Sequence, residues 1–312
     1  MQWAWLFPGQ GAQFVGMGKD VMESSVAARQ VFERADAALG EPLSRLVLEG
    51  PEDVLTMTAN AQPAIVTVSI AILAALKEQY PNLPAPRFAA GHSLGEYSAL
   101  VAAGALTLED AVRLVRARGQ AMQESVPADV GAMAAIMGVE PDRLATLCEQ
   151  AAQGEVVSCA NFNAPGQIVV AGHKAAVGRV SELVSAERGK AIPLKVSAPF
   201  HCALMLPAAK VVETRLGEVS LQNPAFPVVA NFDARPNADA HRVKELLVRQ
   251  VDGAVRWQQA VEFMRAEGIT KALEIGPGKV LSGLVKRIAK DLAVHSVGNR
   301  ETMNAAQAFF EA

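Results

Sequence analysis

The chain has 312 residues, of which 51% are hydrophobic, and its formal net charge at pH 7 is -3. This length and composition suit a globular protein with one large core, or a main domain that carries an insert. The small negative charge and a sequence pI near 6.0 give no reason to expect nucleic acid or a membrane surface as a partner. Three widely spaced cysteines without a C-x-x-C pair fit a reducing, cytoplasmic environment and give no metal-site signature.

The first part of the chain alternates short apolar segments with helical patterns, which is typical of a parallel sheet covered by helices. The apolar segment 1–7 predicts a core strand and lacks the positive charges of a signal peptide. The segment from Ser25 to Leu39 predicts a helix capped by Ser25 and ended by Gly40. A buried helix is predicted from Ala64 to Leu76, with Pro63 in its first turn, and it is too short to span a bilayer.

A serine between two glycines follows the strand predicted from Phe88 to Ala90. The five residues are Gly-His-Ser-Leu-Gly at 91–95, and a helical pattern comes after them. This is the G-x-S-x-G pattern of a nucleophile elbow, in which small neighbours let the chain bend sharply and expose the serine Oγ. The pattern also arises by chance in a chain with 24 glycines, but the strand before it and the helix after it favour catalysis. Ser93 is therefore the predicted nucleophile of an acyl transfer or an ester hydrolysis.

A helix predicted from Ala111 to Met122 places Arg118 on its apolar stripe. Arg113 and Arg116 lie off that stripe and are expected to be in solvent. A buried guanidinium needs an anion, and two kinds are available. One is an internal Asp or Glu, and the other is a substrate carboxylate, which arginine can bind through two nitrogen atoms.

Residues 125–196 change to the order β-α-β-β-α-β, which is the ferredoxin-like pattern. We predict strands at Ala132 to Met137, Val156 to Ala160, Gln167 to Ala171 and Ala191 to Val196, with helices at Pro141 to Gln153 and Ala175 to Glu187 and a turn at Asn163 to Gly166. This segment is predicted to be a small domain inserted into a larger α/β domain made of residues 1–124 and 197–312. The remaining strands of the larger domain are expected near Val228 to Asn231, Ala272 to Ile275 and Ala293 to Val297. A substrate would bind between the two domains.

A serine nucleophile needs a base, and histidine has the pKa for it near neutrality. Among the five histidines, His201 lies where the small domain ends and the chain returns to the larger one. His92 is expected to point away from its neighbour Ser93. The alternative for His201 is a purely structural residue at the domain boundary. The amide of Leu94 and the loop from Pro8 to Gly11 could supply donors to an oxyanion.

Seven segments of the chain, taken together, resemble the malonyl-CoA:acyl carrier protein transacylases and the related acyltransferase domains of polyketide and fatty acid synthases. These segments are FPGQGAQ at Phe7 to Gln13, GHSLGEYSA at Gly91 to Ala99, the Arg118 helix, GAMAA at Gly131 to Ala135, NFNAPGQIVVAG at Asn161 to Gly172, Pro199 to His201, and EIGPGK at Glu274 to Lys279. They follow the family's order over nearly the whole chain. The resemblance implies a hydrolase-like α/β core with a parallel sheet and a nucleophile elbow, together with a ferredoxin-like insert.

The resemblance also implies a ping-pong transfer of malonyl from malonyl-CoA to the phosphopantetheine thiol of acyl carrier protein, without a cofactor. Ser93 would carry the malonyl group, and His201 would act first as base and then as acid. The family orients this histidine through a backbone carbonyl, which corresponds here to Gln250. The protein would be cytoplasmic, and it could be a monomer.

Other positions take their roles from the same resemblance. The amides of Gln10 and Leu94 would form the oxyanion hole, and Arg118 would hold the malonyl carboxylate. Phe200 would crowd a branched methylmalonyl group. Carrier proteins of this kind are acidic, so a basic cluster could dock them. The candidate cluster is Lys286, Arg287 and Lys290, although such a cluster is more often only a solvated face.

Three alternatives to this function remain. A free-standing acyltransferase of a polyketide synthase would use the same residues with another carrier protein. An acyl thioester hydrolase would let water attack the same acyl-serine, but hydrolases related to this family tend to lack the arginine at position 118. A non-catalytic module that only binds carrier proteins would have lost the nucleophile, the base or the oxyanion loop, and the sequence retains all three.

Overall fold

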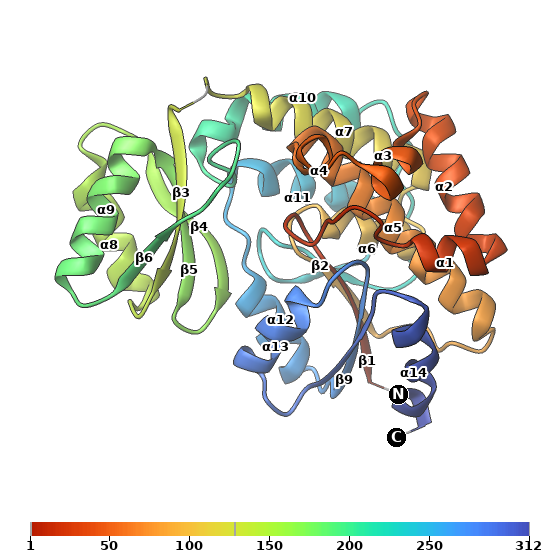
Figure 1. The fold of residues 1–312 in the computed structure, drawn as a ribbon. Coiled ribbons are helices and arrows are strands. Elements are labelled where there is room, and N and C mark those ends of the chain that lie inside the picture. The colour runs from red at the N-terminus through yellow and green to blue at the C-terminus, as the bar shows by residue number, and fades with distance from the viewer. Residues whose placement is uncertain (1, 128, 312) are drawn as a thin grey trace.

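The structure is a computed structural model that describes residues 2–127 and 129–311. Residues 1, 128 and 312, which fall within the predicted domain ranges, lie outside the described residues. The described strands form one sheet of six and one of four, which lie beside each other with helices packed on both (Figure 1).

The larger sheet is parallel except at one edge. Its order is β10 (Ala293–Val297), β9 (Lys271–Ile275), β1 (Trp3–Phe7), β2 (Phe88–Gly91), β7 (Val228–Val229) and β8 (Pro236–Asn237). Only β8, which was not predicted, runs antiparallel to its neighbour. The predicted parallel α/β sheet is confirmed.

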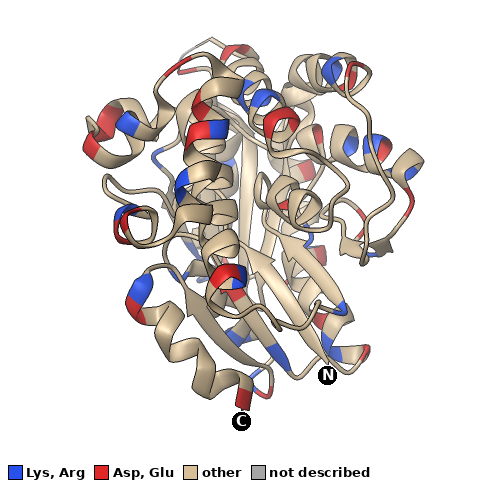
Figure 2. Cartoon of the chain, turned by 90° about the vertical axis from the view of Figure 1, so that its right-hand side faces the viewer, with Lys and Arg blue, Asp and Glu red and all other residues tan. Residues whose placement is uncertain are grey.

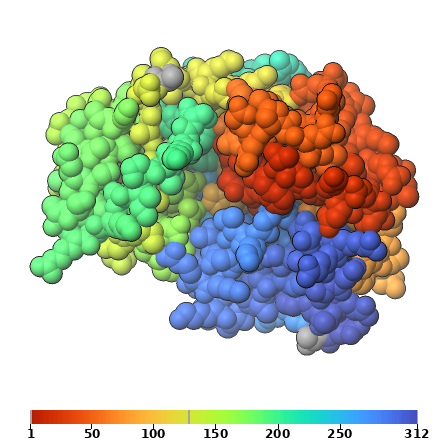
Figure 3. All heavy atoms as spheres, viewed as in Figure 1, coloured from red at the N-terminus to blue at the C-terminus, as the bar shows by residue number. Residues whose placement is uncertain are grey.

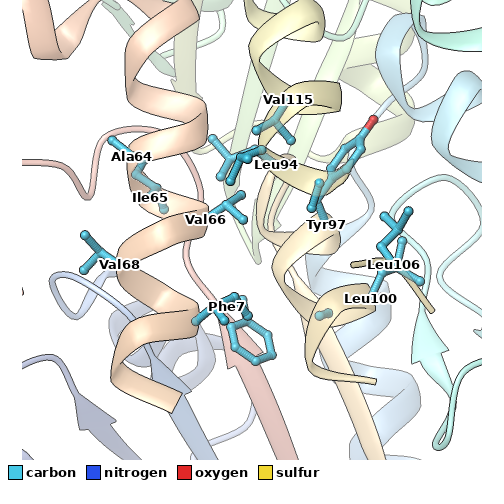
Figure 4. Close-up of a cluster of buried hydrophobic side chains, with 14 of the residues drawn as sticks. Phe7, Ala64, Ile65, Val66, Val68, Leu94, Tyr97, Leu100, Leu106 and Val115 are labelled. Atoms are coloured by element: carbon cyan, nitrogen blue, oxygen red, sulfur yellow. The ribbon is translucent and has the colours of Figure 1, made fainter. Parts of the chain in front are cut away.

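Both faces of this sheet are buried, and β1 shows how. Its residues Trp3, Trp5 and Phe7 enter the larger apolar cluster, whereas Ala4 and Leu6 point into a second cluster on the opposite face. Burial on both faces explains why the strand reads as continuously apolar. The first cluster includes residues of α2 (Val26–Leu39), α5 (Thr58–Gln79), α6 (Gly95–Ala102), α7 (Leu108–Glu124), α10 (Leu206–Leu216), α11 (Ala240–Asp252) and α14 (Arg300–Glu311), and the second includes residues of α12 (Trp257–Ala266) and α13 (Val280–Ile288). Figure 4 shows apolar side chains of α5, α6 and α7 near Phe7 of β1.

Helix α5 begins earlier than predicted, at Thr58, so Pro63 lies inside it. Proline has no N–H to donate to the carbonyl four residues before it. The Ala59 carbonyl accepts instead from Arg116 Nη1 at 2.7 Å, which lets the helix continue through the proline. The expectation that Arg116 lies in solvent is therefore wrong. Helix α5, with 22 residues, is long and apolar enough to cross a membrane, but 83% of its apolar 18-residue stretch is buried inside this fold.

The four-stranded sheet has its elements in the predicted order. They are β3 (Gly131–Met137), α8 (Pro141–Ala152), β4 (Val157–Ala164), β5 (Gln167–His173), α9 (Lys174–Ala186) and β6 (Lys190–Pro193). The strands lie in the order β4-β5-β3-β6, and all neighbours are antiparallel. Most predicted boundaries differ by one or two residues, and two differ by more. Strand β4 continues to Ala164, which shortens the turn to residues 165–166, and β6 ends at Pro193 rather than Val196.

Backbone hydrogen bonds join the four-stranded sheet to the segment between α11 and α12. Val255, between α11 and α12, forms a parallel bridge with Asn161 of β4. Its N–H donates to the Ala160 carbonyl at 2.9 Å, and its carbonyl accepts from Phe162 N–H at 2.9 Å. We call these contacts the Val255 bridge. They fix β4 against the segment that follows α11.

The remaining helices are short, and each adds at least one buried residue to the larger apolar cluster. They are α1 (Lys19–Ser24), α3 (Leu43–Glu49), α4 (Glu52–Thr56) and the 3-10 turn η1 (Ala203–Met205). Lysine and arginine alternate with aspartate and glutamate on the outer helices and loops in Figure 2, while the central strands are mostly uncharged. The charge distribution in this view matches the small net charge of the sequence.

Candidate active site

Ser93 lies in a sharp turn between β2, which ends at Gly91, and α6, which begins at Gly95. Its φ of 52° is in the left-handed region, which is uncommon for serine. A Cβ on Gly91 would lie 2.0 Å from the Gly95 carbonyl carbon and oxygen, and a Cβ on Gly95 would lie 2.2 Å from the Phe7 carbonyl oxygen. The two glycines are therefore needed because backbone segments cross here at close range. The predicted strand, turn and helix are confirmed.

His201 forms a hydrogen-bonded pair with Ser93. The distance from Ser93 Oγ to His201 Nε2 is 2.8 Å, and His201 Nδ1 lies 2.8 Å from the backbone carbonyl oxygen of Gln250. A carbonyl can only accept, so Nδ1 carries the proton and Nε2 can accept the serine proton. Burial and the nearby Arg118 charge lower the pKa of His201 to about 3. The imidazole is thus neutral at pH 7, the state that a general base requires.

Arg118 extends from α7 and is 1% exposed. Its Nη1 donates to Gln62 Oε1 at 2.7 Å, and its Nη2 donates to Ser93 Oγ and to Gln250 Oε1, both at 3.0 Å. Among the described residues Nε has no partner, and no carboxylate lies within hydrogen-bond distance of the guanidinium. The internal ion pair considered from the sequence is therefore not formed. Arg118 is a buried cation that has only uncharged hydrogen-bond partners.

A cavity of about 360 Å³ opens onto these groups. It is lined by Gln10, Gly11, Gln13, Thr56, Gln62, His92, Ser93, Arg118, Met122, Met133, Asn161, Asn163, Val169, Leu194, Lys195, Val196, Phe200 and His201. The lining includes residues of the four-stranded sheet and of the loops that follow β1 and β2, and Figure 3 shows a recess where the green residues of the four-stranded sheet meet the red and orange residues. Two lining residues are cations, and none of the described ones is an Asp or Glu. The cavity therefore suits an anionic ligand.

The loops that follow β1 and β2 lie side by side, as their predicted positions in a parallel sheet require. Phe7 pairs with Gly91, and the His92 N–H donates to the Phe7 carbonyl at 3.1 Å. A Cβ on Gly9 would lie 2.5 Å from the His92 carbonyl oxygen, so glycine is needed for this approach. Among the described residues, the backbone N–H groups of Gln10 and Leu94 donate no hydrogen bond, whereas the Gln10 side-chain amide donates to Thr58 Oγ1 at 3.1 Å. Both backbone N–H groups are thus unused donors next to Ser93.

Phe200 lines the cavity beside His201, as does Lys195. The predicted docking residues Lys286, Arg287 and Lys290 do not line it. Arg287 instead donates to the Pro165 carbonyl at 3.3 Å and to Gln167, and so contacts the turn between β4 and β5. No group of three or more metal-ligating side chains was found in residues 2–127 and 129–311.

Sequence reasoning missed four residues around the site. His92 was given no role, but it lines the cavity, and its Nε2 lies 2.8 Å from Asn163 Oδ1. The other three, Gln62, Glu96 and Asn231, bind the groups described above. Asn231 had one usable signal, because it follows β7 and therefore lies at the same edge of the sheet as the turn after β2.

Comparison with known proteins identifies the family. Residues 4–308 match the acyl transferase domain. The malonyl CoA-acyl carrier protein transacylase of Escherichia coli K12 is 46% identical over 306 residues, which are 98% of both chains. The protein of the same name from Bacillus subtilis is 47% identical over 305 residues, which are 97% of this chain and 95% of the relative.

Solved structures agree with this match. An acyl carrier protein S-malonyltransferase from Vibrio cholerae superposes with a TM-score of 0.95 at 46% identity, covering 98% of this chain and 100% of the other. A malonyl-transacylase solved in complex with a type II polyketide synthase acyl carrier protein has a TM-score of 0.95 at 42% identity, with coverage of 99% and 100%. The chain therefore belongs to the acyl transferase family and is an acyltransferase.

Proposed function

We propose that this enzyme transfers malonyl from malonyl-CoA to the phosphopantetheine thiol of acyl carrier protein, through a malonyl-Ser93 intermediate, to supply fatty acid synthesis. One arrangement carries the proposal: Ser93 Oγ lies 2.8 Å from the neutral His201 and 3.0 Å from Arg118, a buried cation without an anionic partner. A malonyl group offers both an acyl carbon for Ser93 and a carboxylate for Arg118. The names of the relatives at 46% and 47% identity support the same substrate.

In the first half-reaction, Ser93 Oγ attacks the thioester carbonyl carbon while His201 Nε2 takes the hydroxyl proton. The Gln250 carbonyl stabilises the resulting imidazolium through Nδ1–H. The oxyanion forms beside the backbone N–H groups of Gln10 and Leu94, which have no other acceptor among the described residues. The carbon–sulfur bond then breaks, and the CoA thiolate leaves with the proton from His201.

The second half-reaction reverses these roles. The pantetheine thiol of the carrier protein gives its proton to His201, and its sulfur attacks the malonyl ester carbon. The ester bond breaks, Ser93 recovers its proton from His201, and malonyl-carrier protein leaves. Throughout both steps the carboxylate stays on Arg118 and Phe200 borders the acyl group, which disfavours branched groups.

The finer organisation belongs to the same proposal. The β-α-β-β-α-β order and the strand order β4-β5-β3-β6 support a ferredoxin-like small domain at 125–196, inserted into a hydrolase-like core at 1–124 and 197–312. The carrier protein would dock beside Lys286, Arg287 and Lys290, since Arg287 reaches the edge of the four-stranded sheet. The enzyme would act in the cytoplasm as a monomer, without a cofactor.

A polyketide pathway is the second candidate, because one solved relative is bound to a polyketide carrier protein. Loading rates with carrier proteins of both pathways would separate the two. A hydrolase is disfavoured because it has no use for Arg118 beside the nucleophile.

The test of the proposal is intact mass spectrometry of wild type and Ser93→Ala after brief exposure to malonyl-CoA, followed by phosphopantetheinylated carrier protein. We expect a malonyl adduct on wild type only, which then moves to the carrier. An adduct that decays to malonate regardless of the carrier would indicate a hydrolase. The absence of an adduct would refute the proposed substrate.

A further inference from the structure

Glu96 is a buried carboxyl group that the reaction steps above do not use. It lies in the first turn of α6, three residues after Ser93, and is 2% exposed. One of its oxygens, Oε2, accepts from the Asn231 N–H at 2.9 Å and from Gln250 Nε2 at 2.8 Å. A single oxygen atom therefore joins Asn231, two residues after β7, to Gln250 of α11.

Both residues held by Glu96 bind the peptide groups of Ser93. The Ser93 N–H donates to Asn231 Oδ1 at 2.6 Å, and the Ser93 carbonyl accepts from Gln250 Nε2 at 2.9 Å. Asn231 Nδ2 also donates to the Gly91 carbonyl at 2.7 Å. Side chains from two distant segments thus form hydrogen bonds with the N–H and the carbonyl of Ser93, where the backbone is left-handed. Strained backbone of this kind persists only where its surroundings hold it.

Gln250 extends the same network to the base and to the buried cation. Its backbone carbonyl binds His201 Nδ1, and its side-chain Oε1 accepts from Arg118 Nη2 at 3.0 Å. The residue is fully buried. Any shift of Gln250 would therefore move the nucleophile, the base and the carboxylate-binding group relative to one another.

We propose that Glu96 is a positioning residue that fixes Ser93, His201 and Arg118 in one arrangement through Asn231 and Gln250. Catalytic groups must be held to within about 0.5 Å of their working geometry, which requires locked supporting side chains. The inference rests on the proposed function for its substrate, malonyl-CoA. Its effect on the reactivity of Ser93 can be measured without that substrate.

The role that we assign to Glu96 is to accept hydrogen bonds, and this does not require a negative charge. Burial raises the pKa of Glu96 to about 7, and the negative charge of Asp233 adds to the rise. The hydrogen bonds from Asn231 and Gln250 and the positive charge of Arg118 act in the opposite direction and lower this pKa. Near pH 7 both protonation states are therefore present, and Oε2 can accept in either one. A glutamine at this position offers an amide oxygen of the same reach, whereas a leucine offers none.

The experiment compares Glu96→Gln and Glu96→Leu with Ser98→Ala as a matched control. Ser98 is fully buried on the same helix, and its Oγ has no partner among the described residues. The first readout is the labelling rate of Ser93 by a fluorophosphonate, in which Oγ bonds to phosphorus, fluoride leaves and the proton passes to His201. The second is the kcat and KM of malonyl transfer.

We expect Glu96→Leu to slow the labelling of Ser93 at least about tenfold. It should also lower the kcat/KM of malonyl transfer about 100-fold, mostly through kcat, since misplacing catalytic groups by about 1 Å has an effect of this size. Glu96→Gln should stay within about threefold of wild type in both readouts, and Ser98→Ala should match wild type. A merely structural role would instead lower thermal stability and leave the folded fraction fully reactive.

The inference is overturned if folded Glu96→Leu labels like wild type, or if Glu96→Gln is as impaired as Glu96→Leu. Should Glu96→Leu fail to fold, Gln250→Met tests the other end of the network. This variant keeps the backbone carbonyl that binds His201 but loses the side-chain amide that binds Glu96 and Ser93. Unchanged labelling of Ser93 in Gln250→Met would then refute the positioning role. If wild type reacts with the fluorophosphonate but never with malonyl-CoA, the proposed function fails and the positioning role is still tested.

Discussion

Arg118 is a charged side chain that the fold buries with only neutral partners. Its Nη1 and Nη2 groups donate to Gln62, Gln250 and Ser93, and its Nε–H has no acceptor among the described residues. Burying a cation in this way costs free energy, which an incoming carboxylate would recover. The residue therefore offers a physical basis for choosing acyl groups that carry a second carboxylate.

Replacing Arg118 with alanine should reduce malonyl transfer far more than acetyl transfer. We expect kcat/KM for malonyl-CoA to fall about 100- to 1,000-fold, equivalent to about 3–4 kcal/mol, because a buried charge-assisted pair is lost. Acetyl-CoA has no carboxylate and should lose much less. Steady-state rates with both thioesters measure the difference, and equal losses would mean that Arg118 is only structural.

The acid limit of the reaction should lie well below the ordinary pKa of histidine. With the pKa of His201 lowered to about 3, the base stays neutral as the pH falls through 6.5 and is protonated only near the lower value. Single-turnover acylation between pH 4.5 and 8 should thus show no loss centred near 6.5. Tryptophan fluorescence would verify that the protein remains folded, and a midpoint between 6 and 7 would contradict the prediction.

At the scale of single residues, the sequence identifies those that carry a local pattern. Ser93 is flanked by glycines at the end of a strand, and Arg118 interrupts an apolar stripe, so both were found. Asn231 and Gln62 have no such pattern. Asn231 lies 138 residues from Ser93 in the sequence and Gln62 lies 56 residues from Arg118, so their roles arise only when the chain folds. Glu96 stands inside a recognised motif, yet nothing in the motif indicates that its carboxyl is turned towards Asn231 and Gln250.

At the scale of elements, the strands of both sheets were predicted in the right order except for the two-residue strand β8, and the boundaries were less predictable. Helix α5 passes through Pro63, and Arg116, from another helix, binds the carbonyl that the proline leaves free. Strand β4 runs four residues beyond its predicted end because it pairs with β5 as far as Ala164. Both differences come from tertiary partners, which periodicity along a single segment does not contain.

The turn between β2 and α6 should be intolerant of the smallest side chain. Gly95→Ala would place a Cβ 2.2 Å from the Phe7 carbonyl oxygen, and we expect a loss of about 3 kcal/mol in the free energy of unfolding. Gly178→Ala in α9 is the matched control, because nothing lies within 4 Å of its Cβ position. That variant should gain about 0.5–1 kcal/mol. Urea titrations of both would test this, and similar values for the two would contradict it.

For the whole molecule, two buried groups give opposite pH dependences of stability. The pKa of His201 is lowered to about 3, so the folded protein binds fewer protons than the unfolded chain between pH 3 and 6.5, and stability falls as the pH drops. The pKa of Glu96 is raised to about 7, so stability rises as the pH drops from 7 to 4.5. Between pH 4.5 and 6.5 the two effects oppose each other.

Glu96→Gln should remove one of these effects and expose the other. Relative to wild type, the variant should become more stable as the pH rises from 4.5 to 7, by about 1.4 kcal/mol per pH unit and about 3 kcal/mol in total. Urea unfolding of both proteins at four pH values across this range gives the difference. A difference that does not change with pH would show that Glu96 has an ordinary pKa.

The Val255 bridge has a consequence for building chimeric enzymes from related acyltransferases. The four-stranded sheet is covalently attached at its two ends, but its β4 strand also pairs through main-chain atoms with a residue close after α11, the helix that holds His201 through Gln250. Because these bonds use only backbone atoms, sequence alignment alone does not reveal them. A graft of the four-stranded sheet should therefore also carry the donor's segment around Val255, so that β4 keeps its own main-chain pairing partner.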